Sequence, residues 1–107
     1  MGSQGDAGQF RTPRHIIKFL VDVVDPKKED TILDPACGTA GFLIEAFTHI
    51  SKNNSLSPQE HKTLSENIHG VDIDPGMAKI ARVNLYLHGF KTPNIIEDDT
   101  LTNENLW

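Results

Sequence analysis

Three acidic residues stand where segments of strand type end, and their carboxylates could bind a cation or a hydroxyl-rich group. Asp34 ends the aliphatic run 31–33, Asp72 ends a second apolar run, and Asp99 follows a third. The carboxyl ends of parallel strands meet at one edge of an open α/β sheet, and such sheets bind ligands in the crevice there. The sequence therefore predicts an anionic site at that edge.

A loop of small residues follows the first of these acids. Residues 34–43 read Asp-Pro-Ala-Cys-Gly-Thr-Ala-Gly-Phe-Leu, and small residues let a ligand approach the backbone closely. No lysine follows the glycines, which excludes a Walker loop, and Gly38 and Gly41 alone do not make the Gly-x-Gly-x-x-Gly pattern of dinucleotide sites. The acid before the loop would repel a pyrophosphate. S-adenosylmethionine, with its ammonium, sulfonium and ribose, fits this pattern of charge.

This loop resembles the cofactor loop of N6-adenine DNA methyltransferases, and it is most similar to that of the modification subunit of type I restriction–modification systems. The resemblance covers roughly residues 8–101. It implies a Rossmann-like S-adenosylmethionine-dependent methyltransferase fold, a three-layer α/β/α sandwich with a mostly parallel sheet, here truncated. In the family, Thr12 lies in a segment that folds over the methionine end of the cofactor. Ala36, Gly38 and Ala40 stand at the family's small loop positions.

The same resemblance gives the acids and their neighbours roles in cofactor binding. It assigns Asp72, the first acid of Gly-Val-Asp-Ile-Asp-Pro, to the ribose hydroxyls and Ile73 to the adenine face. It assigns an acid after the third strand to the adenine amino group, and Asp99 matches that position better than Asp98. The expected cofactor-binding residues are Thr12, Asp34, Ala36, Gly38, Gly41, Asp72, Ile73, Asp99 and Thr100.

On the residues alone, simpler roles stay open. Thr12 could only cap a helix, and Asp72 and Asp74 could only end a strand and cap the helix after it. A calcium loop is disfavoured because Val83 stands where a bidentate glutamate is needed. A small buried thiol is the favoured role for Cys37, because no histidine lies at a spacing that would make it a nucleophile. The five histidines show no metal-binding spacing, so no metal is expected.

The elements that must position these residues alternate between helix and strand. Apolar periodicity and end signals predict helices over 13–25, about 40–50, 58–66 and 75–88, and strands over 31–33, 68–72 and from 94 onward. Thr12 is the expected N-cap of the first helix, Pro13 its first residue, and the 31–33 strand is expected to be central. The expected buried faces are Ile16, Ile17, Leu20, Val21 and Val24 in the first helix, and Met77, Ile80, Ala81 and Leu85 in the last.

Length and composition fit one small soluble domain or part of a larger one. The 107 residues carry a net charge of −5, which argues against a general nucleic-acid-binding surface. A single cysteine and the lack of a long apolar run favour the cytoplasm and no membrane contact. Residues 1–8 are expected to be disordered or a cloning remnant, and residues 9–107 a partial S-adenosylmethionine-binding domain.

The family's catalytic motif, Asn or Asp, then Pro-Pro, then Tyr or Phe, does not occur in this sequence, so no catalytic residue is assigned. The chain is therefore expected to be the cofactor-binding part of an adenine-specific DNA methyltransferase and to be inactive alone. The family implies DNA, a DNA-specificity subunit and a restriction subunit as partners. The alternatives are a non-catalytic S-adenosylmethionine-binding module and a methyltransferase that acts on protein glutamine or RNA. The glycine pattern disfavours a nicotinamide enzyme.

Overall fold

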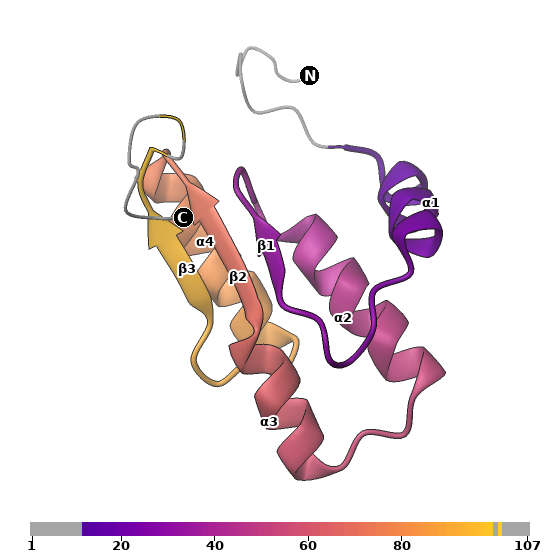
Figure 1. Ribbon diagram of the computed structural model, residues 1–107. Coiled ribbons are helices and arrows are strands. Elements are labelled where there is room, and N and C mark those ends of the chain that lie inside the picture. Colours follow the sequence, from indigo (N-terminus) through magenta and orange to yellow (C-terminus); the bar gives the residue numbers. More distant parts are fainter. Residues whose placement is uncertain (1–11, 100, 102–107) are drawn as a thin grey trace.

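A parallel three-stranded sheet with helices between its strands forms the centre of the molecule (Figure 1). The computed structural model describes residues 12–99 and 101. The strands are β1 (Ile32–Asp34), β2 (Ile68–Asp72) and β3 (Asn94–Glu97), and the helices are α1 (Arg14–Val24), α2 (Gly41–Asn53), α3 (Pro58–Glu66) and α4 (Pro75–Leu87). The predicted α/β class and parallel sheet are confirmed.

The strand order is β1-β2-β3, so β2 is central and β1 lies at an edge of the described sheet. The prediction that β1 would be central was wrong for this part of the chain. β1 has only three residues, and its Leu33 is 41% exposed, whereas Ile68 and Val71 of β2 are buried. A short aliphatic run alone does not tell how many neighbours a strand has.

The helices that connect the strands lie on one face of the sheet, and Figure 1 shows α4 behind β2 and β3. Both crossovers run in the same direction across the sheet, and their common handedness places α2 and α4 on the same side. Leu33 and Ile96, which point to the other face, are exposed. The described residues thus build two of the three expected layers. None of the helices in this part of the chain is long and apolar enough to cross a membrane.

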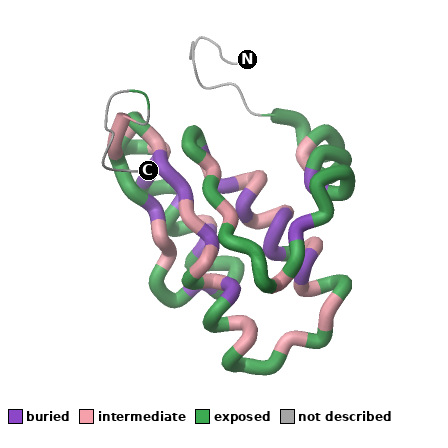
Figure 2. Tube along the Cα trace, in the orientation of Figure 1, coloured by how far each residue is buried: buried purple, intermediate pink, exposed green. Residues whose placement is uncertain are grey.

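The core lies between the sheet and the helices, and buried segments of β2 and α2 are visible in Figure 2. Its fully buried large side chains are Phe90, Leu43, Ile50, Leu64, Ile68 and Leu85. In α4 the packed face consists of Ala78, Ala81 and Leu85, while Ile80, predicted to be buried, is 44% exposed. Ile80 precedes Ala81 by one residue, which rotates its side chain by about 100° around the helix axis and out of the packed face.

Local end signals placed the starts of α3 and α4, whereas α2 runs to Asn53, beyond its predicted end at about residue 50. Ser57 and Glu60 form the predicted capping box at α3, with Ser57 Oγ accepting from the Glu60 amide at 3.1 Å. Asp74 caps α4 by accepting from the Gly76 and Met77 amides, as predicted.

α1 departs from its prediction at its start and on its apolar face. Its N-cap is Pro13, which is extended with a ψ of 142°, so Thr12 lies outside the helix and makes no side-chain cap bond. Val21 is the buried residue of α1, whereas Ile16, Leu20 and Val24 are exposed. The predicted face is therefore only partly covered by α2, and Leu20 and Val24 border an open apolar groove beside α2.

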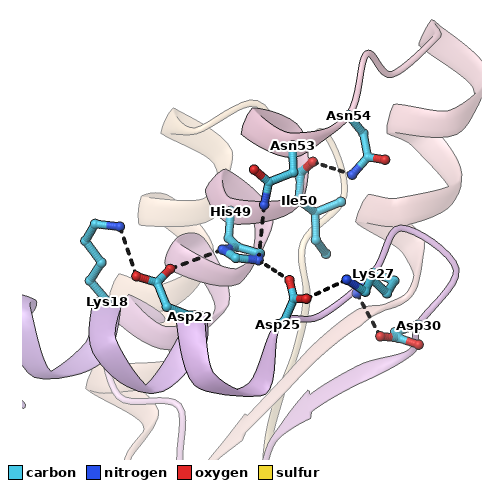
Figure 3. A network of polar contacts seen from close by, with 9 residues as sticks. All are labelled: Lys18, Asp22, Asp25, Lys27, Asp30, His49, Ile50, Asn53 and Asn54. Carbon is cyan, nitrogen blue, oxygen red and sulfur yellow. Dashed lines mark hydrogen bonds and ion pairs between the residues drawn. The ribbon is translucent and has the colours of Figure 1, made fainter.

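A polar network joins α1 to α2 (Figure 3). His49 of α2 has its Nδ1 3.3 Å from Asp22 and its Nε2 2.8 Å from Asp25. Asp25 has a φ of 51° and ends α1, as predicted. Two hydrogen bonds lower the pKa of Asp25: the one from Lys27 has the larger effect, and the one from His49 the smaller. These contacts link the last turn of α1 to α2, and their contribution to stability is small because the side chains of Asp22 and Asp25 are half-exposed.

Gly70 in β2 is required for close packing at the centre of the sheet, and its replacement by alanine is expected to destabilise the fold. An added Cβ would lie 2.7 Å from Ile95 Cδ1, 2.9 Å from Leu43 Cδ1 and 3.0 Å from Cys37 Cβ. Overpacking on three sides costs about 1–3 kcal/mol of unfolding free energy, which urea titration would measure. Gly41→Ala is the comparison and should lose less stability, since its Cβ would meet only the flexible end of Ile17, at 3.2 Å. Equal stability of both variants would contradict this packing argument.

Candidate functional site

The candidate site lies at the carboxyl edge of the sheet, where the three strands end. Asp34 is the last residue of β1, Asp72 is the last of β2, and Asp99 comes two residues after β3. Ile73, directly after β2, is 66% exposed. Thr12 is exposed and stands two residues before α1, and the predicted site residue Thr100 lies outside the described residues.

The loop between β1 and α2 takes its shape from β2. The Cys37 amide donates to the Val71 carbonyl at 2.9 Å, and the Gly38 amide donates to Asp72 Oδ2 at 2.9 Å. Gly38 and Ala40 both have left-handed backbone conformations, with φ of 54° and 73°. Nothing lies within 4 Å of a Cβ added at Gly38, so glycine serves the backbone conformation there. The loop thus places exposed Ala36 and half-buried Gly38 beside the strand ends.

Asp72 holds two backbone segments at once. Its Oδ2 accepts from the Gly38 amide, and its Oδ1 accepts from the Asp74 amide at 2.9 Å. A carboxylate oxygen has two lone pairs, so each oxygen can accept one more hydrogen bond from a ligand. The sequence indicated a ligand role for Asp72 but not this role in holding the loop, because Gly38 is 34 residues away along the chain.

Asp34 is an acid in an unfavourable electrostatic environment. Burial raises its pKa, the hydrogen bond from the Ala36 amide at 3.1 Å lowers it, and the nearby charge of Asp72 raises it further. Asp34 and Asp72 end two strands that pair with each other, so both carboxylates lie at the same edge of the sheet. A bound cation would stabilise the ionised forms of both carboxylates, above all that of the partly buried Asp34.

Cys37 is a buried thiol beside these acids, as predicted. Its side chain is 5% exposed, and burial together with the charges of Asp34 and Asp72 raises its pKa to about 11. A thiol with that pKa is protonated at neutral pH, so it is a poor nucleophile. Its small size also fits the close approach of Gly70.

The segment after β3 is tied to the end of β2. The Asp98 amide donates to the Asp72 carbonyl at 3.0 Å, and Asp99 Oδ1 accepts from the Leu101 amide at 2.9 Å. Asp98 and Asp99 are both half-buried, so the assignment of Asp99 to adenine stays a prediction.

Gly41 has a packing role that the sequence did not indicate. It is the first residue of α2, and Ile17 of α1 lies 3.2 Å from where its Cβ would be. A small residue here lets α1 approach α2. The glycine therefore contributes to the position of α1, and a direct cofactor contact at Gly41 stays a prediction.

An apolar groove of about 370 Å³ lies between α1, β1 and α2 and shares only Asp34 with the predicted site. Its lining is mainly aliphatic and aromatic: Leu20, Val21, Val24, Pro26, Ile32, Leu33, Phe42, Leu43 and Ala46. Such a lining does not match a ligand with an ammonium and a ribose. We therefore place the candidate site at the strand ends and the glycine-containing loop.

The site can bind and orient a cationic or hydroxyl-rich ligand, and the described residues offer no metal centre. No group of three or more His, Cys, Asp or Glu side chains in the described ranges could hold a metal ion. Carboxylates and backbone amides at strand ends fit an organic ligand, with the acids accepting from hydroxyl or ammonium groups.

Comparison with known proteins gives consistent matches. The family model described as N-6 DNA Methylase matches residues 2–106. The type I restriction enzyme EcoEI methylase subunit of Escherichia coli is 41% identical over 104 residues, covering 97% of this chain and 21% of that protein. The type II restriction enzyme and methyltransferase RM.BcgI of Heyndrickxia coagulans is 34% identical, covering 97% and 16%.

A solved structure agrees with these sequence matches. The crystal structure of the type I restriction enzyme EcoKI M protein superposes with a TM-score of 0.82 at 26% identity, covering 94% of this chain and 23% of that one. The chain thus spans about a fifth of the length of the relatives it matches.

Proposed function

The chain belongs to the N-6 DNA methylase family, and from that premise we propose that it is the S-adenosylmethionine-binding part of a DNA adenine-N6 methyltransferase of a type I restriction–modification system. It has the Rossmann-like α/β fold of S-adenosylmethionine-dependent methyltransferases, as the sequence predicted, in partial form. The observation that carries the proposal is the pair of acids, Asp34 and Asp72, which end neighbouring strands beside a loop of small residues.

Each acid has a role that its surroundings support. Asp34, whose pKa burial raises, would face the positively charged methionine part of the cofactor. Asp72 would accept from the ribose hydroxyls through the lone pairs that Gly38 and Asp74 leave open. Exposed Ile73 would contact the adenine face. The segment with Thr12 would lie over the methionine end, and Asp99 with Thr100 near the adenine amino group.

The cofactor supplies the methyl group, and the residues of this chain contribute binding and orientation. Holding donor and acceptor in line is a large part of the catalysis of a group transfer. The Asn/Asp-Pro-Pro-Tyr/Phe motif that would hold the flipped adenine is absent from this sequence, so methyl transfer would need residues outside it. We propose DNA, a specificity subunit and a restriction subunit as partners of the complete assembly.

Isothermal titration calorimetry of the 107-residue chain would test cofactor binding. We expect S-adenosylmethionine and S-adenosylhomocysteine to bind, with the former favoured because its sulfonium adds a positive charge near Asp34. ATP is the control and should bind at least tenfold more weakly, since its phosphates would face two carboxylates. A chain that is folded by circular dichroism and gives no saturable heat with S-adenosylmethionine would contradict the proposal.

A further inference from the structure

We propose that Asn84 of α4 is a positioning residue that holds the loop 35–40 in its ligand-ready shape. Its side-chain amide donates to the Thr39 carbonyl at 2.7 Å, across 45 residues of sequence. This inference rests on the proposed function, because it assigns to that loop the role of approaching the cofactor. Asn84 does not itself need to touch the ligand.

The helix that carries Asn84 is firmly fixed to the core. Ala81 and Leu85, on either side of it along the helix, are fully buried. Arg82 Nη2 donates to the Ile95 carbonyl at 3.1 Å, which ties α4 to β3. Asn84 therefore presents its amide from a rigid element, and a 2.7 Å bond from such an element constrains the loop carbonyl.

The carbonyl that Asn84 holds lies at the least relaxed point of the loop. Thr39 stands between Gly38 and Ala40, whose φ values are both positive. A left-handed conformation is unfavourable for alanine, so Ala40 needs support from its surroundings. β2 supplies one anchor through Asp72, which accepts from the Gly38 amide, and Asn84 supplies the other from α4. The loop is thus held from two sides, and loss of one anchor leaves Gly38 less well placed against Asp72.

Asparagine at position 84 has a simpler role open to it, which is to fill space between α4 and the loop. The variant Asn84→Asp separates the two roles, because aspartate has the same shape but presents an acceptor to the Thr39 carbonyl. Space filling predicts that Asn84→Asp resembles the unsubstituted chain. Positioning predicts that Asn84→Asp is impaired at least as much as Asn84→Ala, because two acceptors then face each other.

Two measurements on the 107-residue chain test the proposal. Amide hydrogen exchange at Gly38 and Ala40 reports the loop without any ligand, and calorimetry reports the affinity for S-adenosylmethionine. For both Asn84 variants we expect about tenfold faster exchange at Gly38 and about tenfold weaker binding, the size of one lost hydrogen bond between partly buried groups. Val83→Ala is the control, because Val83 is the neighbour of Asn84 on α4 and is 54% exposed, and it should change neither quantity.

Wild-type exchange at Gly38 in Asn84→Asp would overturn the proposal. If that variant does not fold, Asn84→Ala decides alone, and unchanged exchange at Gly38 would again overturn it. Should the unsubstituted chain bind no S-adenosylmethionine, the proposed function fails, and the exchange rates still decide whether Asn84 positions the loop.

Discussion

Replacing Asp72 with alanine is expected to weaken S-adenosylmethionine binding by about 100-fold or more, the largest loss for any single substitution in the site. The substitution removes the carboxylate that we assign to the ribose, and it also leaves the Gly38 and Asp74 amides without their acceptor. Hydrogen bonds to a charged acceptor are stronger than neutral ones, so both effects reduce affinity. Calorimetry with the variant and the unsubstituted chain would measure the loss.

A 2′-deoxyribose analogue of S-adenosylhomocysteine separates the two effects of Asp72. If Asp72 accepts from the ribose, the missing hydroxyl weakens binding to the unsubstituted chain and makes no difference to Asp72→Ala. Asp74→Asn is the matched control, because asparagine retains the oxygen that caps α4 and Asp74 is not assigned to the ligand. An equal loss from the missing hydroxyl in both chains would show that Asp72 acts only through the loop.

The parts of the fold that follow from neighbouring residues were predictable. The capping box of Ser57 and Glu60 and the Asp74–Pro75 start of α4 were read directly from the sequence, because each signal and its partner lie within four residues. Burial of α1 was predicted wrongly, and so was the position of β1 among the three described strands. Both depend on which elements pack against them, and that information lies far away in the chain.

The same distinction applies to the site. The positions of Asp34 and Asp72 at strand ends follow from apolar runs that finish in an acid, and the structure places both there. The second role of Asp72, the tight packing of Gly70 and the bond from Asn84 to the Thr39 carbonyl were not foreseen. Each joins residues more than 20 positions apart, and a polar residue in an otherwise apolar stretch of α4 was the only local signal for Asn84.

Asp34→Asn is expected to weaken S-adenosylmethionine binding by about 10- to 100-fold and, at neutral pH, to stabilise the fold. In the folded chain the pKa of Asp34 is raised by burial and by Asp72. A raised folded pKa means that the charged form is less favourable in the fold than in the unfolded chain, so the ionised carboxylate lowers stability at pH values above that pKa. Asparagine keeps an oxygen that can accept from the Ala36 amide and removes the charge. The positively charged cofactor would lose its charged partner, which is worth about 1.5–3 kcal/mol.

Asp34→Asn is thus expected to weaken cofactor binding and to raise stability. The pH dependence of each quantity tests both expectations a second time. As the pH falls through the raised pKa, Asp34 becomes protonated, so the affinity of the unsubstituted chain should fall and the stability gap to the variant should close. The affinity of Asp34→Asn should change less over the same range. Thermal unfolding and calorimetry at several pH values between about 4 and 8 would measure both quantities. Asp30→Asn is the control, because Asp30 is an exposed acid before β1 whose side chain accepts from the Lys27 amide, away from the strand ends. A variant that is both less stable and equally tight in binding would show that Asp34 serves the fold rather than the ligand.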